Sequence, residues 1–420
     1  MAKILKRDGN KLVIEIEMDL FGDMLSQEEA IQEALNEAGK LATVVAFSSF
    51  EEKSSHLEVD GVRFSSKGLK KKELMSPYGK IVVEAQVFQS SQGGACYYPS
   101  DQGSRLIKKT TPRMAKMVSE KYSNACSRRV VEDFEVSHCV SVSPSFVRDL
   151  CDGVLGMIVD QELSCHYELP ADLSLCDVAS VAISVDGVYV PMVDEGFREA
   201  MSGSISLHDQ EGQRLHSIYV ATSPEHGKAA FEVLLEHEIG QIKAILPEVT
   251  YLGIADGASS NWLFLEEHVS LSLIDYYHAS EYLAAFAKAC WGQSLEAKTW
   301  FDKYKTILKE KENGVKRVIK ELQKQLKHFQ SQDNQRSELQ KIVQYFKNQS
   351  PKMNYYWHKQ NNYPIGSGVV EAACKTLVKN RTNQSGMRWK KNGMDAVLTT
   401  RALKASPLRW NQCWKNYMAA

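Results

Sequence analysis

Residues 178–190 are VASVAISVDGVYV, and residues 249–256 are VTYLGIAD. Both runs are apolar and rich in β-branched residues, which is typical of strands buried in a sheet. Each run carries an aspartate followed by a glycine, and these aspartates are Asp186 and Asp256. Asp-Gly is also a common turn signal, so a turn is the alternative interpretation of either aspartate alone. Because an unpaired carboxylate is costly to bury, two aspartates on buried strands favour a site that binds a cation.

The segments around these two runs predict the rest of the same sheet. Residues 203–209 and 214–222 are further β-patterned runs joined by a hairpin turn. Residues 226–246 predict an amphipathic helix, and residues 259–268 and 269–275 predict a short helix and another strand. Three meandering strands followed by helix, strand, helix and strand predict a mixed α/β sheet rather than an all-parallel one.

The N-terminal part of the chain predicts both helices and hairpins. Residues 26–42 predict a helix that begins with a capping-box pair, Ser26 and Glu29. Residues 56–100 alternate in polarity and predict β hairpins. Residues 111–160 predict three short helices.

These three helices are similar to a helix-turn-helix, in which the last helix enters a groove of DNA. The last of them opens at Ser143 and Pro144 and includes Arg148, which we predict to contact DNA. A plain helical bundle is the alternative interpretation.

A helical region is predicted over 279–350, with a break after Pro351 and a last helix near Gly366. We therefore predict six segments in this order: 1–55, helical and strand; 56–110, β hairpins; 111–177, helix-turn-helix-like; 178–278, first part of the α/β core; 279–360, helical insertion; 361–420, last part of the core with a basic C-terminal segment.

The amino-acid composition excludes several classes of protein. Hydrophobic residues make up 43% and charged residues 25% of the 420 residues, which is ordinary for a globular protein and excludes disorder as the main state. The sequence has no run of 18 apolar residues and no secretory signal, so we expect no contact with a membrane. Its 9 cysteines include no Cys-x-x-Cys pair, which favours the reducing cytoplasm over a disulfide framework.

The net charge of −1 hides a segregation of charge along the chain. Residues 296–420 carry 25 Lys and Arg against 9 Asp and Glu, whereas residues 1–295 carry 26 against 43. A basic C-terminal third favours a polyanionic partner, and nucleic acid is the first candidate. A pair of solvated helices is the alternative.

A third acid completes the candidate site. Glu371 lies in PIGSGVVEAACK, residues 364–375, where the glycines allow the chain to pass close to the sheet before a helix begins. Three carboxylates without a His or Cys ligand set favour Mg²⁺ or Mn²⁺ over zinc. Two such ions, roughly 4 Å apart, support phosphoryl transfer.

Several ordered motifs together resemble those of a bacterial insertion-sequence transposase. They are SVDG, GIADGASSNW, IDYYHASEYL and PIGSGVVEAACK, followed by SGMRW. The resemblance is to the Kra-type insertion-sequence family, which is related to Mutator-like elements. It covers residues 178–420 well and the N-terminal portion loosely.

The resemblance implies a ribonuclease-H-like core with a catalytic Asp-Asp-Glu triad that holds the metal ions. Carried over residue by residue, the triad is Asp186, Asp256 and Glu371, and a helical insertion lies between the last two. Related transposases often carry a cysteine-rich zinc motif before the helix-turn-helix. Here only Cys96 remains at that place, so we expect no structural zinc.

The basic stretch after Glu371 is predicted to contact the DNA backbone near the cleaved end, with an aromatic side chain available to stack on unpaired bases. The predicted DNA-contacting residues here are Lys375, Lys379, Arg381, Arg388, Trp389 and Lys390.

The resemblance also draws attention to Asp275 and His278, which would lie beside the acids and contact DNA. Asp275 could instead cap a helix, and His278 could be a packed surface residue. Cys374 is interpreted as a small packing residue rather than a nucleophile, since the sequence offers no Cys-His pair around it.

The leading hypothesis is therefore a metal-dependent DNA transposase of the bacterial cytoplasm, acting on the nucleoid. It would cleave and join strands at the terminal inverted repeats of its element. Bringing two ends together favours a homodimer or a larger assembly on DNA. The alternative is a catalytically silent, domesticated transposase that only binds DNA. A carboxylate-pair glycoside hydrolase ranks last, because the surroundings of Glu371 are basic.

Overall fold

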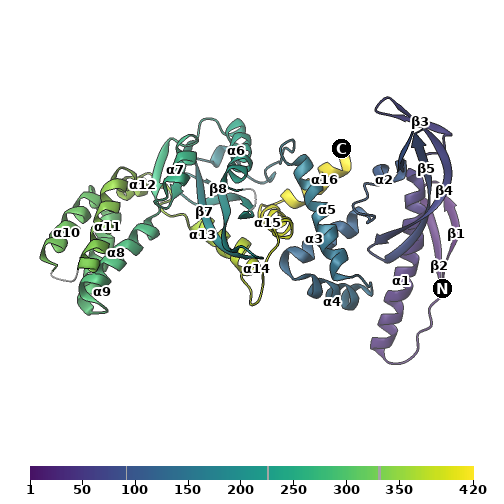
Figure 1. Cartoon of the computed structure of the whole chain (residues 1–420), viewed down its shortest axis with the longest axis horizontal. Coiled ribbons are helices and arrows are strands. Elements are labelled where there is room, and N and C mark those ends of the chain that lie inside the picture. Colours follow the sequence, from purple (N-terminus) through teal and green to yellow (C-terminus); the bar gives the residue numbers. More distant parts are fainter. Residues whose placement is uncertain (91, 225–226, 330–332) are drawn as a thin grey trace. The chain divides into compact units, whose positions relative to one another are not determined.

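The computed structural model describes residues 1–90, 92–224, 227–329 and 333–420, and the chain forms two compact units (Figure 1). Unit 1 consists of Met1–Cys165, Asp395–Thr400 and Asn411–Ala420. Unit 2 consists of His166–Met394 and Arg401–Trp410.

Unit 1 contains the predicted hairpins. Two strands, β1 (Ala2–Asp8) and β2 (Lys11–Ile16), form an antiparallel pair. A second, four-stranded antiparallel sheet has the order β3-β4-β5-β6, and its strands are β3 (His56–Val59), β4 (Val62–Ser76), β5 (Gly79–Ser90) and β6 (Gly93–Tyr97). Alternate residues of β5 are buried, as the alternating sequence predicts.

The helix predicted over 26–42 is α1 (Met24–Phe47), which packs against β5. Its N-cap differs from the prediction. Asp23, rather than Ser26, caps the helix, and its side chain accepts a hydrogen bond from the Ser26 backbone N–H at 2.9 Å. The helix begins before the expected capping box because Asp23 is itself a favourable N-cap residue.

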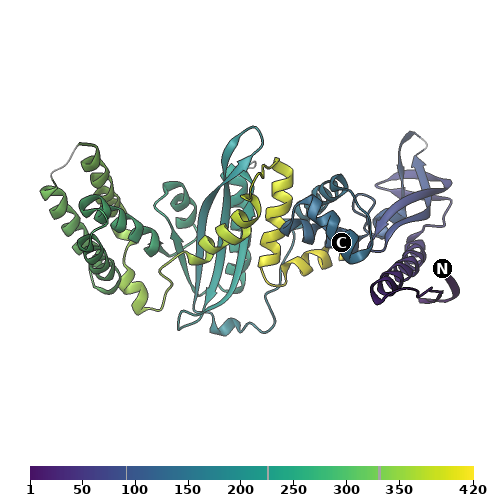
Figure 2. The same ribbon diagram turned by 90° about the horizontal axis from the view of Figure 1, so that it is seen from below.

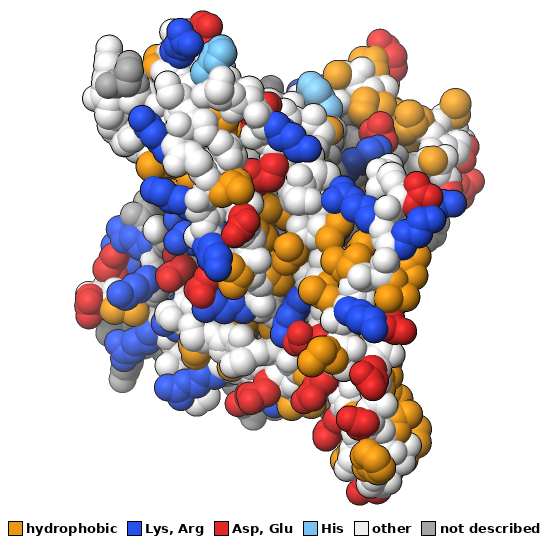
Figure 3. Space-filling view, turned by 90° about the vertical axis from the view of Figure 1, so that its right-hand side faces the viewer, with side chains coloured by type: hydrophobic (Ala, Val, Ile, Leu, Met, Phe, Trp, Pro, Cys, Tyr) orange, Lys and Arg blue, Asp and Glu red, His pale blue; other side chains and the backbone are white. Residues whose placement is uncertain are grey.

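The predicted three helices of unit 1 are confirmed as α3 (Pro112–Asn124), α4 (Ser127–His138) and α5 (Pro144–Glu162); a short helix, α2 (Pro99–Gly103), precedes them. Ser143 caps α5, since its hydroxyl accepts from the Phe146 N–H at 3.1 Å. Apolar residues of the three helices are fully buried, among them Met114, Phe134 and Val154. The face of unit 1 in Figure 3 intersperses acidic, basic and apolar side chains.

Unit 2 is built on a five-stranded mixed sheet of order β11-β10-β7-β8-β9. The strands are β7 (Ser180–Met192), β8 (Gly196–His208), β9 (Arg214–Thr222), β10 (Thr250–Ala255) and β11 (Leu271–Ile274). The first three are antiparallel neighbours, whereas β10 and β11 run parallel to β7. The prediction of a mixed α/β sheet is therefore confirmed.

One strand is longer than predicted. β8 begins at Gly196 instead of Gly203, because β7 and β8 continue as a hairpin up to the Met192–Gly196 pair. Residues 196–199 are solvent-exposed and carry no apolar alternation, so only strand pairing defines this first part of β8.

Helices cover both faces of this sheet. On one face, α6 (Gly227–Ile245) and α7 (Ser259–Glu266) share a core with alternate residues of β7, such as Val181 and Val185. The other face carries α13 (Gly368–Ala373), which contacts β7 and β8 and continues into a π-helical segment, Cys374–Lys379 (Figure 2).

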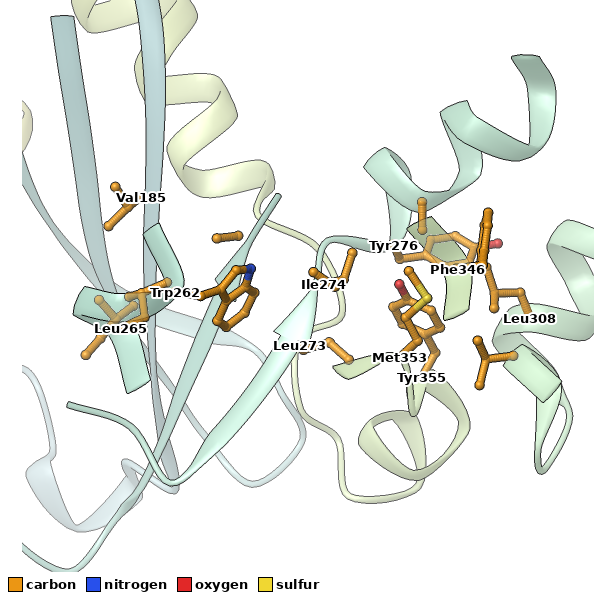
Figure 4. Packing of buried hydrophobic residues seen from close by; sticks show 14 of the residues in the cluster. Val185, Trp262, Leu265, Leu273, Ile274, Tyr276, Leu308, Phe346, Met353 and Tyr355 are labelled. Carbon is orange, nitrogen blue, oxygen red and sulfur yellow. The ribbon is translucent and has the colours of Figure 1, made fainter. Parts of the chain in front are cut away.

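The predicted helical region between β11 and α13 contains α8 (Tyr276–Trp291), α9 (Leu295–Glu310), α10 (Gly314–His328) and α11 (Asp333–Gln349). A further helix, α12 (Tyr355–Gln360), occupies the stretch predicted as a break. We call α8–α12 the insertion. Its core is continuous with that of the sheet, and Figure 4 follows it from Val185 and Trp262 through Ile274 to Tyr276 and Phe346.

The chain ends in α14 (Asn380–Thr382), α15 (Lys391–Ala405) and α16 (Arg409–Ala419), the last two of which contribute residues to both units. Among the described residues, no helix is long and apolar enough to cross a membrane.

Candidate active site

The sheet brings Asp186 and Asp256 to the same level of two neighbouring parallel strands. Ile254 of β10 is paired with Ser184 of β7, and each aspartate lies two residues further along its strand direction. Asp186 is inside β7, opposite Ser202 of β8, and Asp256 directly follows β10. The carboxyl end of parallel strands is where ligand sites form in open α/β sheets.

Both glycines of the Asp-Gly pairs make room for neighbouring side chains. Neither has a positive φ angle. A Cβ atom on Gly187 would lie 2.2 Å from Glu199 Oε1, and one on Gly257 would lie 2.6 Å from Tyr345 Cε2. For Asp186 the turn interpretation is wrong, because this residue lies inside β7. For Asp256 it is confirmed, because the chain bends directly after β10 and the Asp256 side chain accepts from the Ala258 N–H, as a turn aspartate does.

The electrostatics of Asp186 suit a cation. Burial raises the pKa of the Asp186 carboxyl above its ordinary value, and the negative charge of Asp256 raises it further. A hydrogen bond from the Cys374 thiol, one from the Gly187 N–H at 2.8 Å, and the proximity of His278 lower this pKa in part. A divalent cation between the two aspartates would relieve both the burial and the repulsion. This pair of residues therefore fits the predicted Mg²⁺ or Mn²⁺.

Asp256 is held by the first turn of α7. Its Oδ1 accepts hydrogen bonds from the Ala258 N–H at 3.0 Å and from Asn261 Nδ2 at 3.2 Å. Trp262 Nε1 donates to the Asp256 backbone carbonyl at 2.6 Å. Within the described part of the chain, the second carboxylate oxygen makes no hydrogen bond, so it is available to a cation.

Glu371 does not join this pair. It is solvent-exposed in the first turn of α13, and Cys374, three residues later, is the side chain that faces Asp186. In the described ranges of the chain, no three acidic, His or Cys side chains are placed to hold one metal ion. The π-helical segment that begins at Cys374 follows directly, and such segments are frequent at functional sites. The role of Glu371 as the third ligand stays a prediction.

Cys374 is buried, in agreement with its interpretation as a packing residue. Burial, and then the charge of Asp186, raise the pKa of its thiol well above the ordinary value. The thiol therefore stays protonated and acts as a donor toward Asp186 rather than as a nucleophile.

Asp275 requires a correction. Its side chain is only 3% exposed, and its two carboxylate oxygens are used within the fold, so it does not present a surface to DNA. Oδ1 caps α8 by accepting from the His278 N–H at 2.9 Å, and Oδ2 accepts from both the N–H and the hydroxyl of Ser367. The alternative interpretation of Asp275 as a helix cap is confirmed. His278 is half-buried, 3.6 Å from Glu281.

Asp275 thus ties the start of the insertion to the loop before α13. We expect Asp275→Ala to lower the free energy of unfolding by about 3 kcal/mol, since a cap and two charge-assisted hydrogen bonds are lost. Urea denaturation measures this. Asp302→Ala, at an exposed position on α9, is the control and should change stability by less than about 0.5 kcal/mol. Equal stability of the two variants would contradict the structural role.

The remaining residues predicted to contact DNA divide into two groups. Lys375, Lys379, Arg388 and Lys390 are exposed, as DNA contacts require, and so is Arg148 on α5, whose guanidinium lies 3.3 Å from Ser127 Oγ.

Arg381 and Trp389 form the second group and are a correction, since they are only 2% and 7% exposed. The Arg381 guanidinium lies over the Trp389 ring at 4.6 Å, and Trp389 Nε1 donates to the Thr382 carbonyl at 3.0 Å. The Trp389 N–H also donates to the Pro191 carbonyl on β7. Trp389 therefore fastens this segment to the sheet and is not available to stack on a base.

Sequence reasoning did not identify three residues that lie close to the two Asp-Gly pairs: Glu199, Tyr345 and Lys228. Lys228 Nζ donates to Ser260 Oγ and Asn261 Oδ1, both at 2.6 Å, and its charge interacts with Asp256. Tyr345 reaches the site from α11, and its buried hydroxyl has no hydrogen-bond partner among the described residues. No local motif marks these residues, because the pairing of distant elements alone places them there.

No model of a known protein family matches this chain, and no curated protein sequence matches it.

Proposed function

We propose that this protein is a DNA transposase that cleaves and joins strands at the terminal inverted repeats of an insertion sequence by metal-dependent phosphoryl transfer. The observation that carries the proposal is the placement of Asp186 and Asp256 at one level of adjacent parallel strands, with the pKa of Asp186 raised by burial and by Asp256. Three antiparallel strands followed by two parallel ones support a ribonuclease-H-like core.

In this proposal Asp186 and Asp256 would hold two Mg²⁺ or Mn²⁺ ions, and Glu371 would join their ligand set in the working complex. Ions bound there would stabilise the attacking and leaving oxygens of an in-line displacement. Lys228 keeps Asn261 and the first turn of α7 in place against Asp256. The exposed Lys375, Lys379, Arg388 and Lys390 would hold the DNA backbone.

The partner of this site would be double-stranded DNA, both as element end and as target. Synapsis of two ends would require a homodimer or a larger assembly, and the place of action would be the bacterial cytoplasm. A catalytically silent DNA-binding protein is the competing function, and the cleavage experiment separates the two.

Glu371→Gln tests the third member of the triad. Because Glu371 is exposed and would enter the site only in the working complex, we expect cleavage of a duplex with the element's ends to fall about 100-fold, as for a misplaced catalytic group. Cleavage should require Mg²⁺ or Mn²⁺ and stop with a chelator. The rate of strand incision is the measurement.

Glu296→Gln is the matched control, since Glu296 is also an exposed acid in the first turn of a helix. It should cleave at the wild-type rate. A Glu371→Gln variant as active as this control would remove Glu371 from the triad.

A further inference from the structure

One helix of the insertion presents a strongly basic face. Helix α10 exposes five cations: Lys316, Arg317, Lys320, Lys324 and Lys327. At 3.6 residues per turn, their positions fall within about 100° of the helix circumference. The opposite face carries Val315, Val318 and Leu322, which are buried in the core of unit 2.

These five cations are not neutralised by the fold. Among the described residues, none of them forms an ion pair with a carboxylate. Lysines on neighbouring elements do form such pairs, as Lys341 does with Glu338, and Lys352 with Glu266.

The one acidic residue on α10 is turned away from this face. Glu321 Oε1 accepts a hydrogen bond from Gln325 Nε2 at 2.7 Å and from Trp300 Nε1 of α9 at 3.4 Å. Its carboxylate is therefore engaged toward α9. The charge of Lys324 still lowers the pKa of Glu321, but among the described residues Glu321 forms no ion pair with any of the five cations.

Repulsion among these five cations destabilises the helix unless a polyanion binds to this face. Like charges three and four residues apart repel one another on a helix surface. From Lys316 to Lys327 the face extends over about 16 Å, at a rise of 1.5 Å per residue. Duplex DNA of that length carries about ten phosphates. Four of the five cations are lysines, which act as point charges toward phosphates and carry no base-specific geometry.

We infer that the basic face of α10 is a DNA-backbone-binding surface, separate from the basic residues that follow Glu371. Helix α10 itself lies on the insertion, on the side away from the sheet (Figure 1). The inference rests on the DNA partner in the proposed function but not on catalysis, since backbone contacts need neither metal nor triad.

The test is a charge-neutralised variant of the whole protein, with Lys316, Lys320, Lys324 and Lys327 each replaced by Gln. Binding to a duplex of arbitrary sequence is measured by fluorescence anisotropy in EDTA, between about 50 and 200 mM NaCl. We expect the Kd at about 100 mM NaCl to rise tenfold or more, and the slope of log K against log salt to become shallower by about 2 to 4.

The control removes the same charge from lysines that already face a carboxylate: Lys3, Lys6, Lys80 and Lys341, each replaced by Gln. Its slope should change by less than about 1. Equal effects of both variants, an unchanged slope in the α10 variant, or a wild-type chain that does not bind the duplex would each overturn the inference. Because binding is measured in EDTA, a failure of catalysis is read separately, in the cleavage assay.

Discussion

Asp186→Asn is expected to lower the rate of metal-dependent DNA cleavage about 1000-fold or more. A bound cation contributes several kcal/mol to the stabilisation of transition-state charge, and each 1.36 kcal/mol is a factor of ten in rate. Asparagine keeps the size of the side chain and an oxygen that can accept from the Gly187 N–H. It removes the negative charge that the cation requires. The rate of strand incision on end-bearing DNA is the measurement.

The same variant should fold as well as the wild type. Burial and the charge of Asp256 raise the pKa of Asp186, so its ionised form is disfavoured in the metal-free fold. Replacing it by a neutral side chain should leave the metal-free Tm unchanged or raise it. Mg²⁺ should raise the Tm of the wild type by mass action and should have a smaller effect on the variant.

Asp194→Asn is the matched control for this prediction. Asp194 is exposed in the turn between β7 and β8 and has a φ angle of 64°, which asparagine tolerates. The control should keep both cleavage and the Mg²⁺ effect on Tm. Cleavage by Asp186→Asn at the rate of this control would exclude Asp186 as a catalytic carboxylate.

The second large effect is expected on stability, at the buried ion pair of Glu238 on α6 and Arg409 on α16. Their side chains are 9% and 4% exposed, and the Arg409 guanidinium also lies over the Tyr167 ring at 4.6 Å. Glu238→Gln leaves a buried guanidinium without its counter-charge. We expect the free energy of unfolding to fall by about 3 to 5 kcal/mol, measured by urea denaturation.

Two further variants test whether this loss of stability comes from burying an unpaired charge. Glu338→Gln breaks the exposed pair with Lys341 and should change stability by less than about 1 kcal/mol. Replacing Glu238 and Arg409 together by Met should recover most of the loss, because no charge is then left buried. A loss at Glu238 no larger than the loss at Glu338 would contradict the buried pair.

Much of the secondary structure of unit 2 could be predicted from the sequence, because its buried strands and helices carry apolar residues at regular intervals. β9 has the bounds expected from its β pattern, and α6 and β10 lie within a residue or two of theirs. The same β-branched runs located Asp186 and Asp256, and parallel pairing of their strands then places them side by side. Local pattern and long-range pairing agree here.

The features that the sequence did not predict depend on contacts between distant residues, and such contacts leave no local pattern in the sequence. A tryptophan among lysines indicates an exposed stacking residue, but Trp389 is covered by Arg381 and pairs with the end of β7. The resemblance indicates a DNA contact for Asp275. Instead, its two carboxylate oxygens accept hydrogen bonds from the start of α8 and from Ser367 in the loop before α13. Helix α12 occupies the polar, aromatic stretch predicted as a break. Its Tyr355 is buried and packs against Tyr276 of α8.

The most direct test of the central claim is the product of the full-length protein acting on DNA that carries the element's own ends. With Mg²⁺ or Mn²⁺, we expect incision at the junction of element and flank, a free 3′-hydroxyl on the element end, and joining of that end to a target duplex. A stable, end-specific complex that makes no incision with either ion would contradict the claim and would leave a DNA-binding protein without catalysis.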